Sequence, residues 1–261
     1  MRKFKHGVIV DLYKFQMVMD ISSVSVEQMR QVDRVAVEDF GLQILMMMEN
    51  ASIYTASLAQ RMLNNTVKNK KILILAHKGN NGGDGLGAAR HLANKGAEIT
   101  VVLTCTPNEL TSEGMNQYRI LHRSGIPIIE LDTLNMSTVK TLISTSDLIV
   151  DALLGYNIKG APRSPIDLII SAINSSPVQT LSIDIPSGLD GDTGLPHRPT
   201  VKATATLTLA MPKKGLLLLS AQKYIGELWV ADLSIPQSVY QKLNIAANNV
   251  FEENSLYKIQ L

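Results

Sequence analysis

The chain has 261 residues, of which 45% are hydrophobic and 18% charged, and its formal net charge at pH 7 is only +2. This length allows one or two domains with a well-buried core, and the nearly balanced charge gives no indication of a nucleic-acid surface. The single cysteine, Cys105, excludes an internal disulfide and favours the reducing cytoplasm, and no apolar run approaches the length of a membrane span.

The N-terminal part of the chain contains an extension and two helices. Residues 1–23 show no clear periodicity and are interpreted as an N-terminal extension; charged residues interrupt their apolar stretch, so we do not expect a secretory signal. Ser25 and Gln28 have the spacing of a capping box, which predicts a helix start. A second helix is expected over residues 42–63. The apolar face of the first helix consists of Met29, Val32, Val35 and Ala36.

From residue 71 onward, short apolar runs alternate with amphipathic segments. The runs predict strands near 71–76, 98–104, 127–130, 147–152, 179–184, 203–209 and 226–231. Helices are predicted between the first five strands, near 84–95, 111–123, 137–145 and 165–174. We therefore predict an α/β fold, a Rossmann-like three-layer α/β/α sandwich with a mainly parallel central sheet. Without a linker or an internal repeat, residues 24–261 are predicted to form a single domain.

A glycine-rich segment, Gly79–Gly85, follows the first predicted strand. Its four glycines, two amides and one carboxylate are not expected in core packing, because glycine is useful where the backbone turns sharply or approaches a ligand. A strand, a glycine-rich turn and a helix N-terminus together form an anion site, in which free N–H groups and the positive end of the helix dipole face the ligand. The segment therefore predicts a site for a phosphate or pyrophosphate group.

Two common phosphate loops fit this segment poorly. A P-loop requires Lys and then Ser or Thr after its second glycine, whereas alanines follow the glycine of matching spacing here, so nucleoside triphosphate hydrolysis is not expected. A Rossmann G-x-G-x-x-A pattern can be read from Gly83 to Ala88. The next strand, however, ends at Thr104 without the carboxylate that normally binds ribose, which disfavours an ordinary NAD-dependent oxidoreductase.

Two aspartates, Asp151 and Asp184, close predicted strands at the same edge of the sheet. A carboxylate beside apolar strand residues is costly unless it is paired, bound to a ligand or used in chemistry. The five histidines show no spacing typical of metal ligands, so a zinc site is not expected. Asp151, the amide oxygen of Asn81, Ser187 and backbone carbonyls would form an all-oxygen set that suits a hard cation, although the same groups could also bond to one another.

Five separated segments closely resemble the YjeF N-terminal domain family, whose members are NAD(P)H-hydrate epimerases and are also called apolipoprotein A-I-binding-protein-like. The resemblance runs from about Ser25 to Ile235. The segments are Met48–Ala51, Gly79–Gly85, Val150–Leu153, Asp184–Asp190 and Met211–Gly215.

This resemblance implies an isomerase that interconverts the R and S forms of hydrated NADH or NADPH in nicotinamide nucleotide repair. Asp184 would be the catalytic acid and base, and one potassium ion per subunit would be bound by Asn81, Asp151 and Ser187. Members often read G-T-G-L where this chain has Gly-Tyr-Asn-Ile from Gly155, so a difference in substrate fit is expected there. The substrate-binding residues would be Asn80, Asn81, Gly82, Gly83, Asp84, Gly155, Tyr156, Asn157, Ile158, Lys159, Gly160, Ala161 and Asp184.

The alternative is a catalytically inactive binding and dimerisation module, because the same domain also occurs in that role. The intact glycine-rich segment and both aspartates favour the enzyme. The resemblance further implies a homodimer. Some members carry a second, dehydratase domain; since this chain ends at Leu261, we expect a functional partnership with a separate NAD(P)H-hydrate dehydratase and no nucleic-acid or membrane partner.

Overall fold

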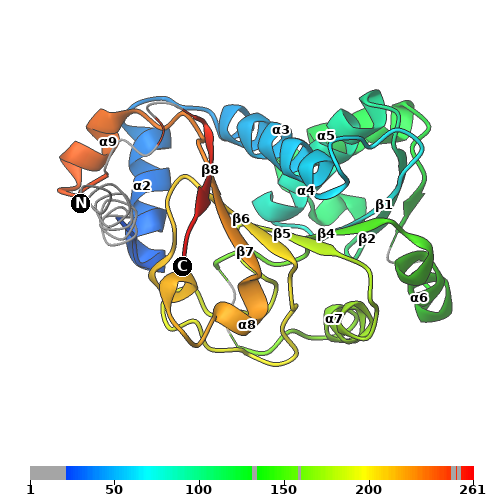
Figure 1. The fold of residues 1–261 in the computed structure, drawn as a ribbon. Helices are drawn as coiled ribbons and strands as arrows, with labels where there is room; N and C mark the ends of the chain where they lie inside the picture. The colour runs from blue at the N-terminus through cyan, green and yellow to red at the C-terminus, as the bar shows by residue number, and fades with distance from the viewer. Residues whose placement is uncertain (1–21, 131–133, 158–159, 248–250, 252–253) are drawn as a thin grey trace, which may run out of the picture.

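The computed structural model describes residues 22–130, 134–157, 160–247, 251 and 254–261. Within them, the strands form one eight-stranded sheet in the order β3-β2-β1-β4-β5-β6-β7-β8 (Figure 1). Every neighbouring pair is parallel except β7 and β8, which are antiparallel. The strands are β1 (Lys71–Ala76), β2 (Glu98–Leu103), β3 (Ile128–Ile129), β4 (Leu148–Ala152), β5 (Thr180–Ile183), β6 (Ala205–Leu209), β7 (Glu227–Ala231) and β8 (Leu256–Ile259).

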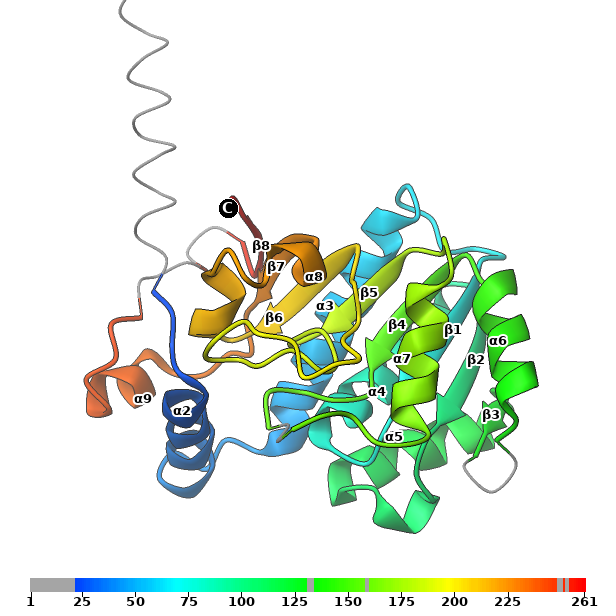
Figure 2. The same cartoon turned by 90° about the horizontal axis from the view of Figure 1, so that it is seen from below.

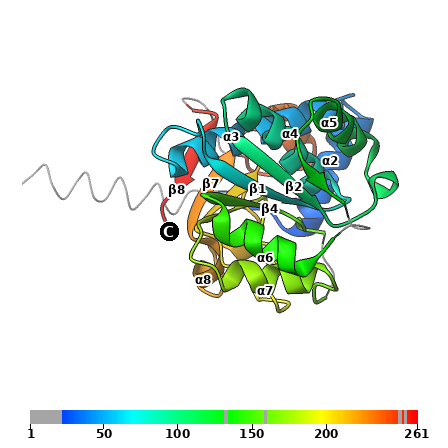
Figure 3. The same cartoon turned by 90° about the vertical axis from the view of Figure 1, so that its right-hand side faces the viewer.

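Helices cover both faces of this sheet. Viewed along the sheet, α3, α4 and α5 lie on one side and α6, α7 and α8 on the other (Figure 3), and Figure 2 shows the second group lying over the strands. Helices α2 and α9 pack side by side at one end of the molecule (Figure 1). The helices are α2 (Val26–Glu38), α3 (Ile44–Met62), α4 (Asn80–Asn94), α5 (Ser112–Arg123), α6 (Met136–Thr145), α7 (Ile166–Asn174), α8 (Gln222–Ile225) and α9 (Gln237–Lys242), with short 3-10 turns η1 (Pro107–Glu109) and η3 (Lys214–Leu217).

Strand β1 illustrates how the sheet is buried on both faces. Ile72 and Ile74 belong to the core on the side of α3 and α4, whereas Leu73 and Leu75 belong to the core on the side of α6 and α7. All four side chains are buried. Because both faces are covered, the strand reads as a continuous apolar run rather than as an alternating one. The predicted three-layer α/β/α fold with a mainly parallel sheet is confirmed.

Most predicted elements are present. The seven expected strands all occur within two residues of their expected ends, and Ser25 caps α2 through reciprocal bonds with Gln28 of 3.1 and 2.9 Å. Strand β8 and the short helices α8 and α9 were not predicted, because Lys258 interrupts the apolar residues of β8 and each of the two helices is shorter than two turns. Residues 1–21 of the predicted extension lie outside the described residues. In the described part of the chain, no helix combines the length and apolarity that a membrane span requires.

Candidate functional site

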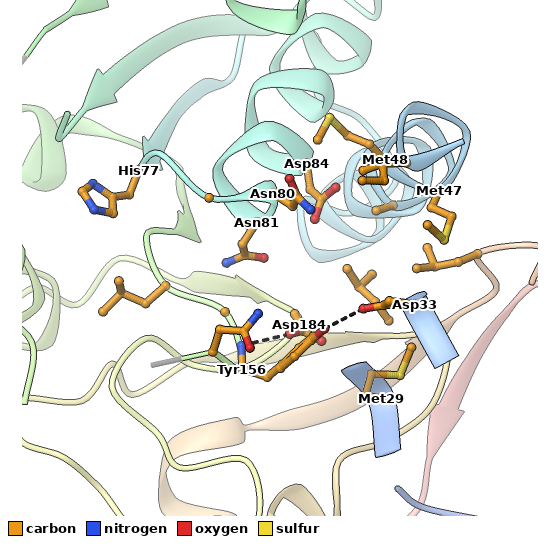
Figure 4. A pocket seen from close by; sticks show the side chains of 18 of the residues that line it. Met29, Asp33, Met47, Met48, His77, Asn80, Asn81, Asp84, Tyr156 and Asp184 are labelled. Carbon is orange, nitrogen blue, oxygen red and sulfur yellow. Dashed lines mark hydrogen bonds between the residues drawn. The ribbon is translucent and has the colours of Figure 1, made fainter. Parts of the chain in front are cut away.

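The site lies at the carboxyl ends of β1, β4, β5 and β6. Strand β1 pairs with β2 on one side and with β4 on the other. The direction in which successive strands are added to the sheet therefore reverses between β1 and β4. A crevice forms at such a switch point, because the chain leaves the two strands toward opposite faces. A cavity of about 710 Å³ occupies this position (Figure 4). Its walls come from α2, α3, the start of α4, the loop after β4 and the ends of β5 and β6.

The glycine-rich segment is the first part of a helix, not a turn. Helix α4 begins at Asn80 rather than at residue 84 as predicted. A Cβ on Gly82 would lie 1.7 Å from the carbonyl oxygen of His77, and a Cβ on Gly85 would lie 2.5 Å from the Cβ of Ala152. These glycines therefore let α4 approach the end of β1 and the face of β4 closely. The expectation that they take no part in core packing is wrong.

The N-terminus of α4 lines the cavity. Gly79 is the N-cap residue and provides no capping side chain, and Gly79, Asn80 and Asn81 are all part of the wall. The first N–H groups of a helix have no partner within the helix, and the helix dipole is positive at this end. The predicted anion site therefore has the required local geometry, although it is built from a helix start instead of a glycine turn.

The amide oxygen and nitrogen of the Asn81 side chain are buried and find no hydrogen-bond partner among the described residues. Leaving such a group unpaired costs about 1–3 kcal/mol, so a polar ligand is expected to meet it. A Cβ on Gly155 would lie 3.4 Å from the Cβ of Asn81 and 3.5 Å from Oδ2 of Asp184. Gly155 therefore leaves open the space between the start of α4 and the end of β5.

Asp151 is fully buried at the end of β4. Its carboxylate accepts hydrogen bonds from the hydroxyl of Ser182 (2.8 Å), the hydroxyl and N–H of Ser187 (2.6 and 2.9 Å) and the N–H of Leu153 (3.3 Å). Burial raises the pKa of Asp151, while the bonds from Ser187 and Ser182 oppose this rise. The Ser187 hydroxyl also accepts a bond from the N–H of Leu154 (2.9 Å). Asp151 thus holds the loops after β4 and β5 together.

Asp184 follows β5 in a left-handed conformation with a φ of +65°. The N–H of Ile185 donates to the carbonyl of Ile183 (2.8 Å), which makes Asp184 the centre of a strained γ-turn. Its Oδ1 accepts a 2.5 Å bond from the ammonium of Lys213, and its Oδ2 accepts a longer bond of 3.3 Å from the N–H of Tyr156. The carboxylate is almost completely buried but lines the cavity.

Two further aspartates, Asp33 of α2 and Asp84 of α4, face the same cavity (Figure 4). Burial raises the pKa of Asp84 well above its usual value, and the negative charges of Asp184 and Asp33 add to this rise. Burial also raises the pKa of Asp33, against the effect of a 2.5 Å hydrogen bond from the hydroxyl of Tyr156. The side chains of three aspartates therefore share the cavity with the buried ammonium of Lys213, and Glu38 also lines its wall.

Neither Asp33 nor Lys213 is a candidate site residue on sequence grounds. Asp33 lies one helical turn after Met29, at the border of the apolar face of α2, and this position was the available signal. Lys213 stood in the segment Met211–Gly215, directly after an apolar strand end, where a lysine requires a partner. Cys105 is buried, and burial raises the pKa of its thiol to about 12.

Residues 44–215 match the family model described as YjeF-related protein N-terminus. The chain belongs to this family. An NAD(P)H-hydrate epimerase from Dehalogenimonas lykanthroporepellens is 36% identical over 225 residues, covering 86% of this chain and 87% of the relative. An NAD(P)H-hydrate epimerase from Pirellula staleyi is 36% identical over 216 residues, covering 82% of this chain and 93% of the relative.

Longer relatives and one solved structure extend this comparison. The bifunctional NAD(P)H-hydrate repair enzyme Nnr of Moorella thermoacetica is 36% identical over 217 residues, which cover 83% of this chain but only 41% of that protein. The crystal structure of yeast ynu0 (YNL200c) superposes with a TM-score of 0.77 at 24% identity, covering 91% of this chain and all of that one. The yeast structure shows that the YjeF-type fold is shared.

The structure places the residues expected from the YjeF resemblance in three groups. Those that line the cavity are Asn80, Asn81, Asp84, Gly155, Tyr156, Asn157 and Asp184. Those buried outside the cavity wall are Gly82, Gly83, Asp151 and Ser187. Gly160 and Ala161 are exposed and do not line the cavity, and Ile158 and Lys159 lie outside the described residues. Among the described residues, no cluster of three or more His, Cys, Asp or Glu side chains suits a metal ion.

Proposed function

We propose that the protein is an NAD(P)H-hydrate epimerase, an isomerase that interconverts the R and S forms of hydrated NADH or NADPH. The observation that carries this proposal is the 36% identity to an epimerase of that name across 86% of the chain and 87% of the relative. The cavity of about 710 Å³ lies within the range of about 300–1,000 Å³ that small-molecule sites occupy. Its apolar walls, helix N-terminus and buried carboxyl groups supply matching surfaces for a ring, a pyrophosphate and a reacting hydroxyl group.

The proposed chemistry requires one group that moves a proton. NAD(P)H hydrate carries a hydroxyl on C6 beside the ring nitrogen, a hemiaminal. Inversion proceeds by one of two routes. Either the hydroxyl is lost as water to leave an iminium, to which water adds on the other face, or the ring opens to an aldehyde, which the nitrogen attacks on the other face to close the ring. Both routes move a proton onto and off one oxygen or nitrogen, so a single carboxylate can act alternately as acid and base.

We assign that role to Asp184. Its Oδ1 is held by Lys213, whereas Oδ2 receives only the 3.3 Å bond from the N–H of Tyr156 and lies beside Gly155. Oδ2 is therefore the oxygen available to the substrate. The proposed substrate contacts are the start of α4, from Asn80 to Asp84, for the phosphate groups and the loop from Gly155 to Ala161 for the rest of the molecule.

The proposal includes one potassium ion per subunit, held by Asn81, Asp151 and Ser187. The amide oxygen of Asn81 supports this site, because it is buried and unpaired among the described residues, whereas Asp151 and Ser187 bond to each other at 2.6 Å and would have to turn an oxygen toward the ion. A bound potassium ion would supply positive charge for the pyrophosphate and for the two loops. Proton transfer rests on Asp184 alone.

The assembly and setting are also part of the proposal. We propose a homodimer, a cytoplasmic location and a functional partnership with a separate NAD(P)H-hydrate dehydratase. The resemblance to the family supports the dimer and the partnership, and the single buried Cys105 suits a reducing compartment.

A chromatographic assay tests the activity directly. The purified protein is given pure R-hydrate of NADH, and formation of the S-epimer is followed with and without potassium. Rapid equilibration supports the epimerase. No acceleration over the spontaneous rate, in protein shown to be folded, contradicts it and leaves the inactive binding and dimerisation module, which no present observation favours.

A further inference from the structure

Lys213 is a lysine with almost no contact with solvent. Its side chain is 1% exposed, and its ammonium donates to Oδ1 of Asp184 (2.5 Å) and to the carbonyl oxygen of Leu209 (3.1 Å). The same nitrogen lies 5.3 Å from the ring centre of Tyr156. Burying an ammonium is costly unless it is paired and hydrogen-bonded. Lys213 is therefore held in one position by these three groups, unlike a flexible lysine at a surface.

The neighbouring strands β5 and β6 are each followed by a γ-turn, one centred on Asp184 and one shortly before Lys213. Ala210 follows β6 with a φ of +60°, and the N–H of Met211 donates to the carbonyl of Leu209 (2.7 Å). This γ-turn matches the one centred on Asp184. Residues other than glycine with a positive φ are strained, and such strain is concentrated at functional sites. Asp184 is the centre of one strained turn, and the ammonium of Lys213 bonds to the carbonyl of Leu209 that closes the other.

The two oxygens of Asp184 have different surroundings. Oδ1 faces the buried ammonium, and Oδ2 faces Gly155 and the cavity. We propose that Lys213 is the positioning residue of Asp184: by binding Oδ1 it fixes the rotation of the carboxylate and presents Oδ2 to the substrate. This inference rests on the proposed epimerase function. A carboxylate that gives a proton to one oxygen or nitrogen of the substrate and later takes it back must stay within hydrogen-bonding distance of that atom.

Removing the ammonium tests this role. Lys213→Ala and Lys213→Met are compared with the wild type and with Lys214→Ala, a variant of the neighbouring exposed lysine. We expect kcat to fall by about 100-fold in both Lys213 variants, the usual effect of a misplaced catalytic group. KM for the hydrate should change little, because Lys213 acts through Asp184. Lys214→Ala should keep the wild-type rate.

A small amine separates positioning from a merely structural role. Methylamine can enter the space left by Lys213→Ala from the cavity, and we expect it to restore kcat in proportion to its concentration. It should not restore Lys213→Met, whose side chain fills that space. Wild-type kcat in either folded Lys213 variant, or a loss of rate in Lys213→Ala that methylamine leaves unchanged, would overturn the proposal.

Two further measurements do not depend on activity. In a crystal structure of Lys213→Met, the Asp184 carboxylate should have rotated. An unchanged orientation of the carboxylate overturns the positioning role, whether or not the wild type is active. An inactive wild type, by itself, contradicts only the epimerase. If the single variants fold poorly, the Asp184→Asn/Lys213→Met double variant should be more stable than Lys213→Met, because no buried carboxylate is left unpaired. Equal or lower stability of the double variant would count against the pairing.

Discussion

The hydroxyl of Tyr156 donates a 2.5 Å hydrogen bond to Oδ2 of Asp33, and this bond ties the loop after β4 to helix α2 (Figure 4). A second bond, from the guanidinium of Arg30 to the amide oxygen of Asn157 (2.7 Å), joins the same two elements. The loop is the place where this chain departs from the G-T-G-L pattern common in its family. Of the residues that differ, Tyr156 and Asn157 both bond to α2, and Ile158 lies outside the described residues.

Tyr156→Phe tests the role of the hydrogen bond to Asp33. The substitution keeps the ring beside Lys213 and the backbone N–H to Asp184 but leaves the half-buried Asp33 without its donor. We expect the free energy of unfolding to fall by about 1 kcal/mol, the usual net contribution of one hydrogen bond. KM for the hydrate should rise while kcat is largely kept, because the loop is released but the carboxylate is not moved.

Urea unfolding and steady-state kinetics measure the two effects separately. Tyr54→Phe, a half-buried tyrosine of α3 outside the cavity wall, is the matched control and should change neither. An unaltered KM and stability in Tyr156→Phe would show that the bond to Asp33 does not hold the loop.

Asp184→Asn tests the proposed acid and base. Asparagine keeps an oxygen that can accept from Lys213, so the variant should fold, although with lower stability because the buried ammonium loses its charged partner. Loss of general acid–base catalysis typically lowers a rate by about 10²–10⁴-fold, and we expect a decrease of this size in the chromatographic assay. Circular dichroism provides the folding control. Turnover like that of the wild type in the folded variant would refute the assignment.

The fold was predictable because its signals are local. Each apolar run of the parallel sheet is buried on both faces, as β1 shows, and therefore stands out from the amphipathic helices around it. The capping box at Ser25 is likewise contained within four residues. Asp151 and Asp184 could be found because each ends such a run.

The remaining site residues depend on contacts between distant parts of the chain. Asp33 meets Tyr156 across 123 positions, and Lys213 meets Asp184 across 29, so nothing near either residue in the sequence indicates the pair. The glycines after β1 were misread for the same reason. Their purpose is a close approach between α4 and the sheet, which only the packed structure reveals.

Gly85→Ala tests this explanation of the glycines. A Cβ at this position would lie 2.5 Å from the Cβ of Ala152, a contact that requires α4 to shift on the sheet. Overpacking of this kind usually costs about 1–3 kcal/mol, even though alanine is the better helix former. Gly79→Ala is the control in the same segment, because a Cβ there meets no atom within 4 Å. Chemical denaturation should show a clearly larger loss for Gly85→Ala, and equal losses would contradict the packing explanation.

Asp84→Asn tests the electrostatics of the cavity through the pH dependence of stability. Burial holds the pKa of Asp84 in the folded protein well above its usual value of 3.8. Between the unfolded and the folded pKa, the folded state binds a proton that the unfolded state has lost, so the contribution of Asp84 to stability falls as pH rises. Because asparagine does not ionise, the variant does not lose this stability as the pH rises. We therefore expect the variant to melt at a higher temperature than the wild type at pH 7, by about 2–4 °C for each kcal/mol gained, and the difference to disappear near pH 4. Thermal melts at the two pH values, without substrate, measure this difference in melting temperature. A lower melting temperature of the variant at pH 7 would show that the surroundings stabilise the Asp84 carboxylate instead.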